Sequence, residues 1–285
     1  MTEIQKVILD IFKEVSSLCE QHGIPYYAIG GTCIGAIRHN GFIPWDDDLD
    51  IAVPIESFEK LKRVLRDNLP PKYQLYDCNG VTHYHYIFMK VHNVETTYIN
   101  NKSKQYKDSY TGIYMDIMPL GGIPDSRLGK TFFINRIKIF YALNYLRRFP
   151  LCIQKSVRGK ILSLLFKPPL AAFRYNYFSD KYLELLQKHP FDSSKLTGYV
   201  WQPAKISKLI FPKEWFQSTK KVKFEDTVIC CPNDYRSYLS AHFGDYMKLP
   251  PEKDRIEVHP SYLDFEHSYT EYQNGTRIIT LKKKE

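Results

Sequence analysis

A glycine pair separates a β-prone segment from a helical one, and an acidic run follows within about 20 residues, which restricts the chain to few folds. Residues 26–29 favour a strand, Gly30-Gly31 allows a tight turn, and residues 32–39 favour a short helix. Free amides at a helix start, with no side chain in the way, can bind phosphate. Gly30, Gly31 and Thr32 are therefore predicted to contact a phosphorylated ligand.

The acidic run leads into alternating polar and apolar residues, which predict a strand over residues 48–53. Successive strand side chains point to opposite faces, so Asp48 and Asp50 would share a face while Leu49 faces the core. Adjacent carboxylates repel each other unless a cation lies between them, and their oxygens suit Mg²⁺. Asp48 and Asp50 are the predicted metal ligands, and Asp46 and Asp47 are assigned to supporting or solvated positions. The alternative is a solvated acidic turn.

Asp116 is the candidate for a third carboxylate. It lies among the alternating residues 112–118, which predict another strand. Two-metal phosphate transfer commonly uses a third acid, which holds one metal and can accept the proton of the attacking hydroxyl. An unpaired carboxylate in such a strand would be costly without a cation. The alternative is a buried aspartate paired with a lysine or an arginine.

Basic side chains are candidates for holding the phosphates. Lys90 alternates with apolar residues and could act as a point charge; the alternative is a solvated lysine at a sheet edge. The guanidinium fork of Arg38 suits a diphosphate, and His39 could bind phosphate or cap its helix. Arg255, together with His259, could close the site from the C-terminal side.

The order of the remaining elements predicts an α+β fold, a mixed β-sheet with flanking helices, in a chain of 285 residues. We expect a catalytic core over residues 1–126, a basic helical segment over 127–200, and a C-terminal part over 201–285 that completes the core and the site. Further predicted elements are helices over residues 4–21, 57–69 and 235–243, strands over 73–77, 84–93 and 96–99, a turn at Asn79-Gly80, and a hairpin or edge strand over 221–229.

The net charge of +9 is concentrated in one segment. Residues 127–179 hold eleven Lys or Arg residues and no Asp or Glu, and the rest of the chain has 29 basic and 31 acidic residues. We interpret this segment as two or three helices, broken near Pro150 and Pro168-Pro169, whose basic and apolar residues suit an anionic membrane surface. The alternative is a packed helical subdomain with a solvated basic face. Aromatic residues at positions 132, 133, 140, 141 and 145 follow a helical apolar face, which argues against nucleic-acid binding.

The N-terminus lacks a long apolar run, and no apolar stretch reaches the roughly 18 residues that span a bilayer. We therefore expect a cytoplasmic protein, peripheral at the inner face of the cell membrane. The six cysteines form no CxxC pair, so neither disulfides nor a zinc site at Cys230-Cys231 is favoured.

Residues 30–51, with the motif GGTCIGAIRHNGFIPWDDDLDI, resemble the signature of the LicD family, and three further stretches resemble it in the same order. These are residues 90–96, 114–120 and 243–251. The resemblance implies a nucleotidyltransferase-like fold, with Asp48 and Asp50 matching the family's carboxylate pair and Asp116 its third acid. The chain departs from the family at His92, where an arginine is frequent, and at Gly121, where an aspartate is frequent.

The family resemblance implies transfer of phosphocholine, or a similar phospho-alcohol, from CDP-choline or another CDP-alcohol. The acceptor would be a sugar hydroxyl of a lipid-linked or oligosaccharide glycan, such as teichoic acid or lipopolysaccharide. Two Mg²⁺ ions are the expected cofactors, and CMP is the expected product. The alternatives are nucleotidyl transfer from a nucleoside triphosphate, which could use the same three acids, and a non-catalytic module that binds a membrane or nucleic acid.

Overall fold

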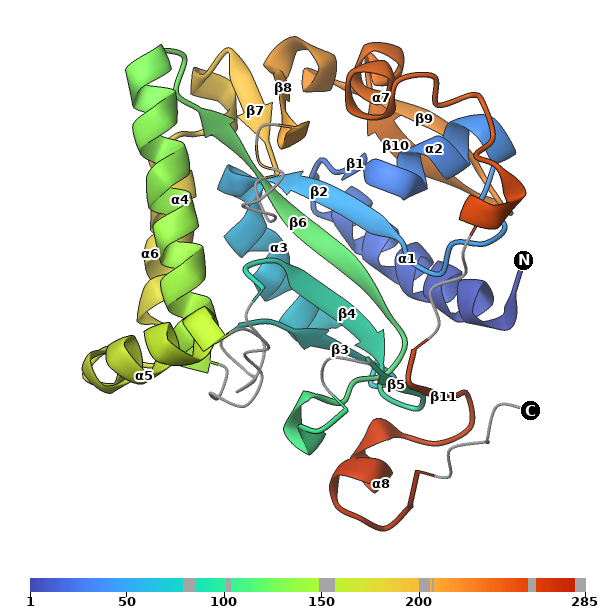
Figure 1. Ribbon diagram of the computed structural model, residues 1–285. Coiled ribbons are helices and arrows are strands. Elements are labelled where there is room, and N and C mark those ends of the chain that lie inside the picture. Colours follow the sequence, from blue (N-terminus) through green and yellow to red (C-terminus); the bar gives the residue numbers. More distant parts are fainter. Residues whose placement is uncertain are drawn as a thin grey trace.

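The protein is described by a computed structural model, which covers residues 1–78, 86–100, 104–148, 157–199, 206, 208–255 and 260–279. The turn predicted at Asn79-Gly80, the break predicted at Pro150, and His259 lie outside these residues. A mixed sheet runs through the centre of the molecule, with helices packed around it (Figure 1). This architecture confirms the predicted α+β class.

The central sheet has the strand order β1-β2-β6-β4-β3, and β7 and β8 extend it from the far half of β6. The β2–β6 pair is parallel and its other pairs are antiparallel. The strands are β1 (Tyr27–Ala28), β2 (Asp50–Pro54), β3 (Tyr73–Tyr76), β4 (Met89–Asn93), β6 (Tyr114–Ile123), β7 (Leu196–Gly198) and β8 (Ile210–Pro212). β2 is buried on both faces beyond Asp50, as expected for a strand in the middle of a covered sheet.

The N-terminal helices pack around the central sheet. They are α1 (Glu3–Gln21), α2 (Gly30–His39) and α3 (Ile55–Asn68). α1 begins with a capping box at Thr2 and buries Ile8, Phe12 and Val15, which repeat at helical spacing. α3 ends just before Pro70, as predicted from the Pro-Pro pair.

The basic segment forms α4 (Arg127–Arg148), α5 (Val157–Ala171) and α6 (Tyr177–Gln187). Pro168 and Pro169 lie inside α5, so the break predicted there is wrong. The two prolines remove only two amides near the helix end, and the last turn is closed by the amides of Ala172 and Phe173. Leu196–Gly198 then returns the chain to the central sheet as β7.

Two small two-stranded sheets complete the fold. The predicted hairpin is formed by β9 (Thr219–Phe224) and β10 (Thr227–Pro232), and it is followed by α7 (Tyr235–Phe243), which Asp234 caps. β5 (Thr97–Ile99) pairs with β11 (Tyr262–Asp264), and α8 (Tyr269–Gln273) follows. Short 3-10 turns lie at Lys107–Ser109, Phe191–Ser193, Lys213–Phe216 and Glu252–Asp254.

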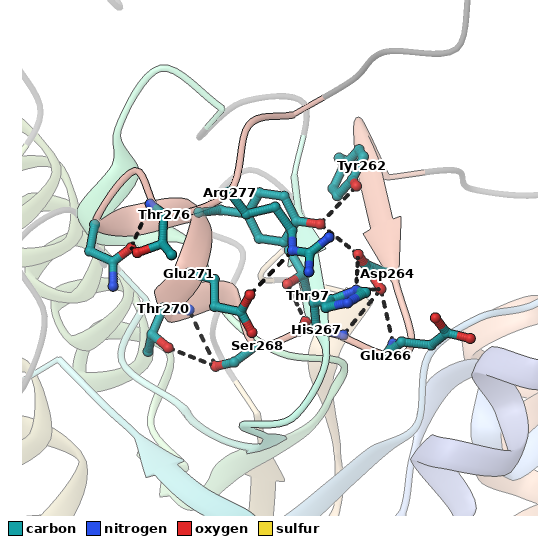
Figure 2. A network of polar contacts seen from close by, with 12 residues as sticks. Thr97, Tyr262, Asp264, Glu266, His267, Ser268, Thr270, Glu271, Thr276 and Arg277 are labelled. Atoms are coloured by element: carbon teal, nitrogen blue, oxygen red, sulfur yellow. Dashed lines mark hydrogen bonds and ion pairs between the residues drawn. The ribbon is translucent and has the colours of Figure 1, made fainter.

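The C-terminal residues form a compact polar network around Asp264 (Figure 2). Its carboxylate accepts hydrogen bonds from the Tyr272 hydroxyl at 2.5 Å and from the backbone amides of Glu266 and His267. Thr97, in β5, donates to the carbonyl of His267. This network holds the end of the described chain against a strand that lies more than 160 residues earlier.

Candidate active site

The two strands that carry the predicted acids lie side by side. Asp50 is the first residue of β2 and Asp116 the third of β6, and they are register partners in the parallel pair. Asp48 is exposed in extended chain just before β2, so the predicted strand begins two residues too early. The alternation is nevertheless correct, because Leu49 between the two acids is fully buried. The parallel register therefore brings Asp116 to the acidic motif.

The protein around these carboxylates and their mutual repulsion disfavour the charged forms. Burial, followed by the charge of Asp48 and then that of Asp116, raises the pKa of Asp50 well above its ordinary value. Although solvent reaches Asp48, the surrounding protein and the acids at positions 46 and 116 raise its pKa as well. No described residue donates a hydrogen bond to the carboxylate of Asp50. A divalent cation would relieve this repulsion, so the donor chemistry fits Mg²⁺.

In the described residues, no group of three or more His, Cys, Asp or Glu side chains already has the arrangement of a metal site. The metal ligands therefore remain a prediction, which rests on the shared register and the electrostatics of the three acids.

Asp116 is paired with Lys90, which is its register partner on β4. The Lys90 ammonium lies 2.6 Å from Oδ1 of Asp116 and 3.3 Å from the centre of the Tyr114 ring. Lys90 is buried in the middle of the sheet, so the alternative of a solvated lysine at a sheet edge is wrong. Burial raises the pKa of Asp116, and the Lys90 charge opposes that rise. One oxygen of Asp116 thus has a cationic partner already.

The glycine turn lies directly beside the acids. Gly30 begins α2 with a φ of +57°, and a Cβ there would lie 3.8 Å from Oδ2 of Asp50. A Cβ at Gly31 would come within 2.6 Å of Oδ2 of Asp46, so only glycine fits that position without displacing the acid. The Thr32 hydroxyl accepts the amide of Asp50 at 2.8 Å, which ties the first turn of α2 to the start of β2. The turn and the acids therefore form one unit.

The amides at the start of α2 are not equivalent. The Gly30 amide donates to the buried hydroxyl of Tyr238 at 2.8 Å, whereas the amides of Gly31 and Thr32 have no acceptor among the described residues. Those two amides are the ones available to an anion.

Of the basic residues predicted on the C-terminal side, Arg255 is described, and it lies close to Arg38 of α2. Arg38 donates to the carbonyl of Tyr246 at 2.7 Å and to ring Nε2 of His39 at 2.9 Å. Burial lowers the pKa of Arg38, and the nearby charge of Arg255 lowers it further. The Arg255 guanidinium lies 5.2 Å from the Trp45 ring. Neither arginine has an ion-pair partner among the described residues, which leaves adjacent positive charges available to a phosphate.

Some contributing residues escaped the sequence reasoning. Gln5 in α1 is buried and donates to the carbonyls of Ile43 and Asp46, at 3.1 and 2.7 Å, which holds the acidic loop in place. Its signal was visible as a polar residue three positions before Ile8 on the apolar face of a helix. Tyr238 and Tyr114 gave no such signal, because a chain with 22 tyrosines offers many candidates.

The two departures from the family pattern lie outside this cluster. His92 is fully buried between the rings of Tyr76 and Tyr269, and burial lowers its pKa to about 3, so its ring is neutral. Its Nδ1 accepts the amide of Gly112 at 3.1 Å. Gly121 lies against Leu186 of α6, five residues along β6 from Asp116. Neither position contacts the three acids.

Comparisons with known proteins bear on the family of this chain. Residues 23–151 match the family model described as LicD/FKTN/FKRP, nucleotidyltransferase domain. The chain is 29% identical over 273 residues to the lipopolysaccharide cholinephosphotransferase LicD of Haemophilus influenzae, which covers 91% of this chain and 96% of that protein. A 58-residue stretch is 38% identical to an uncharacterised protein of Rickettsia prowazekii, covering 20% of this chain and 22% of that protein.

Proposed function

Because this chain belongs to the LicD family through its domain at residues 23–151, we propose that it is a transferase that moves phosphocholine onto a cell-surface glycan. The relative in Haemophilus is named for phosphocholine transfer and for lipopolysaccharide, and it matches almost the full chain. We further propose CDP-choline or another CDP-alcohol as the donor, Mg²⁺ as the cofactor, and a sugar hydroxyl of a lipopolysaccharide- or teichoic-acid-type glycan as the acceptor.

The observation that carries the proposal is the register of β2 and β6, which brings Asp50 and Asp116 together at the glycine turn. The three predicted acids would hold Mg²⁺, which supplies positive charge to offset the charge that develops on the phosphate oxygens. Because the acids repel a diphosphate by themselves, such a site needs cations before it can accept one.

The donor would lie between this acidic cluster and the basic residues of α2. The amides of Gly31 and Thr32 can donate to its phosphate oxygens, and Arg38 and Arg255 add positive charge. Arg38 is already oriented by the carbonyl of Tyr246, so it would act from a fixed position. Lys90 would act on the donor through Asp116, which it contacts directly.

The chemistry would proceed by in-line attack of the acceptor hydroxyl on the phosphorus that bears choline. A new bond forms between that phosphorus and the sugar oxygen, while the bond to the phosphate of CMP breaks and CMP leaves with the electron pair. The proton of the hydroxyl would pass to Asp116, which acts as the general base.

CMP release from a panel of CDP-alcohols, with Mg²⁺ and a glycan acceptor, tests the proposal. We expect CMP from CDP-choline with the wild type and a loss of about a thousandfold or more in Asp50→Asn and Asp116→Asn, because each removes a charge that acts on the transition state. Asp226→Asn is the matched control, since its exposed carboxylate only pairs with Lys13 at the surface. CMP release from no donor, or an unchanged rate in Asp50→Asn, would contradict the proposal.

Nucleotidyl transfer is the second candidate, because the matching family model is described as a nucleotidyltransferase domain. The same acids would serve, and a nucleoside triphosphate would release pyrophosphate. A thermal-shift panel separates the two functions, since a bound substrate raises the melting temperature. Stronger Mg²⁺-dependent stabilisation by ATP or CTP than by CDP-choline would favour nucleotidyl transfer.

A further inference from the structure

Helix α4 has two apolar faces, and only one of them is covered. Phe133 and Ile137 are buried and belong to the main hydrophobic core. Leu128, Phe132 and Ile139 are 84%, 66% and 54% exposed. A helix turns by about 100° per residue, so these three side chains lie roughly opposite the buried face. The aromatic residues predicted to share one face therefore divide between two, with Phe132 outside and Phe133 inside.

Uncompensated positive charges flank the exposed stripe. Arg127 and Lys138 lie on one side of it by the same helical spacing, and neither has an ion pair among the described residues. Arg136 lies on the other side, with its guanidinium 5.5 Å from the Phe132 ring. Because residues 127–179 contain no acid, no carboxylate from this segment neutralises the charges.

Helix α5 packs against α4 and carries exposed apolar side chains of its own. Val157, Ile161, Leu164 and Leu165 are 52–72% exposed and follow helical spacing. We call the exposed apolar residues of the two helices, together with Arg127, Arg136 and Lys138, the α4–α5 face. In Figure 1 these helices lie at one edge of the molecule, and α2 with the glycine turn lies toward the other. A partner on this face would leave the acidic cluster accessible.

We propose that the α4–α5 face docks on the surface of an anionic lipid bilayer, with its apolar side chains in the interface and its cations at the headgroups. None of the described helices is both long and apolar enough to cross a bilayer, so the helices would lie along the surface. Transfer of the exposed apolar side chains out of water would lower the free energy of the system. The flanking cations would favour an anionic over a neutral lipid surface. This inference goes beyond the proposed transfer reaction and does not depend on it.

Charge argues against the other occupants of this face. A second copy would bring the same cations against one another, which opposes association. Nucleic acid would satisfy the charges, but Phe132 is the one aromatic side chain among the exposed apolar residues that define this face, and the aliphatic others offer no stacking surface for successive bases.

Flotation with lipid vesicles tests the proposal on the full chain. We expect the protein to float with phosphatidylcholine vesicles that contain about 30 mol % phosphatidylglycerol and not with pure phosphatidylcholine. Phe132→Ser with Ile139→Ser should weaken binding to the anionic vesicles at least about tenfold, because each removes an exposed apolar group that docking would transfer from water into the bilayer interface. Arg127→Gln with Lys138→Gln should weaken it by about fivefold for each cation, and added salt should reduce that difference.

The double variant Val228→Ser with Lys223→Gln is the matched control, since both side chains are exposed on the β9–β10 hairpin. It should bind like the wild type, and all variants should keep the wild-type melting temperature and release CMP equally with a water-soluble acceptor. Absence from both vesicle fractions, equal binding to neutral vesicles, or binding that the α4 variants leave unchanged would each overturn the proposal. So would a dimer, seen by light scattering, that the α4 variants abolish. Because CMP release is measured without vesicles, failure of the proposed reaction would be recognised separately.

Discussion

Asp50 and Asp116 lie side by side on neighbouring strands, but they differ in the charged groups that contact them. Lys90 neutralises one oxygen of Asp116, whereas no described side chain offers a positive charge in direct contact with Asp50. Burying a charged carboxylate costs less free energy when an ammonium is ion-paired with it, because the attraction within the pair offsets part of the lost solvation. Asp50 is therefore the acid that needs a bound cation most, which is why Asp50→Asn is the most direct test of the reaction.

Tyr238 acts on the site through the backbone. Its fully buried hydroxyl accepts the Gly30 amide and lies 2.7 Å from the hydroxyl of Tyr199, which is itself 3.1 Å from Nδ1 of His242. The chain of contacts uses one of the amides at the start of α2 and so leaves the next two for a ligand. We regard Tyr238 as a positioning residue.

We predict that Tyr238→Phe lowers the free energy of unfolding by about 1–3 kcal/mol, since the Gly30 amide and the Tyr199 hydroxyl each lose a partner. CMP release should fall as the turn loses its anchor. Urea unfolding and initial rates measure the two effects. Tyr199→Phe is the comparison, because it keeps the bond to Gly30 and should affect the rate less. Equal rates in the wild type and Tyr238→Phe would remove the positioning role.

At the scale of elements, the first turn of α2 is joined to the start of β2 on both sides. The amide of Ile29 donates to the carbonyl of Asp50 at 3.2 Å, and the amide of Asp50 donates to Thr32. These bonds make the glycine turn and the first acid of β2 move together. A substitution that disturbs the turn should therefore also change the position of Asp50.

Gly30→Ala tests this coupling against Gly23→Ala. Both glycines have left-handed φ values, +57° and +61°, so each alanine should cost about 1–2 kcal/mol in free energy of unfolding. A Cβ at Gly23 has no neighbour within 4 Å, whereas one at Gly30 faces Asp50. Unfolding should thus be affected alike, and only Gly30→Ala should reduce CMP release. Similar rates in both variants would show that the turn does not act on the acids.

The register of the central sheet also positions the charged residues of the site. Asp50, Asp116 and Lys90 occupy one row across β2, β6 and β4. Because strand side chains alternate, a slip of one residue would turn Asp116 to the other face and replace it with an apolar neighbour. The buried residues on either side of Asp116, Met115 and Ile117, fix the register through the core.

At the scale of the whole molecule, the C-terminal segment closes on strands from the first half of the chain. Besides the Thr97 contact, β11 pairs with β5 and the Tyr269 hydroxyl donates to Gln74. Burial opposes ionisation of Asp264, but hydrogen bonds from Tyr272, the Glu266 amide and His267 outweigh it and hold the pKa of Asp264 below its ordinary value (Figure 2). The negative charge of Asp264 therefore stabilises the closed segment.

The lowered pKa of Asp264 predicts that the stability of the C-terminal segment depends on pH. A carboxylate with a lowered folded pKa adds stability above its unfolded pKa of about 3.9, and that stability is lost as the pH falls through the folded value. Amide hydrogen exchange of residues 262–273, corrected for the intrinsic rate, gives the free energy of opening. We expect the wild type to exceed Asp264→Asn by about 1–3 kcal/mol above pH 5, with the difference shrinking below about pH 4.

Glu266→Gln is the control for this segment, because its exposed side chain makes no hydrogen bond or ion pair with a described residue and only its amide joins the network. It should behave like the wild type at every pH. A difference between the wild type and Asp264→Asn that stays constant from pH 6 to pH 3 would contradict the assignment of the charge.

The spacing of residues along the chain was sufficient to predict four local features. These are the glycine turn, the alternation around Leu49, the helix after Asp234 and the strand around Asp116. Each depends on residues within a few positions of one another, where backbone geometry decides which side chains share a face. The bonds from Tyr238 to Gly30 and from Lys90 to Asp116 join residues 208 and 26 positions apart, and only packing shows which partner is chosen. The same holds for α4, whose periodicity shows two apolar faces, while α6 and the core decide which one is covered. The sequence by itself thus determined the chemical groups of the site, and the tertiary structure decided their partners, because burial and long-range pairing depend on neighbours that local sequence does not specify.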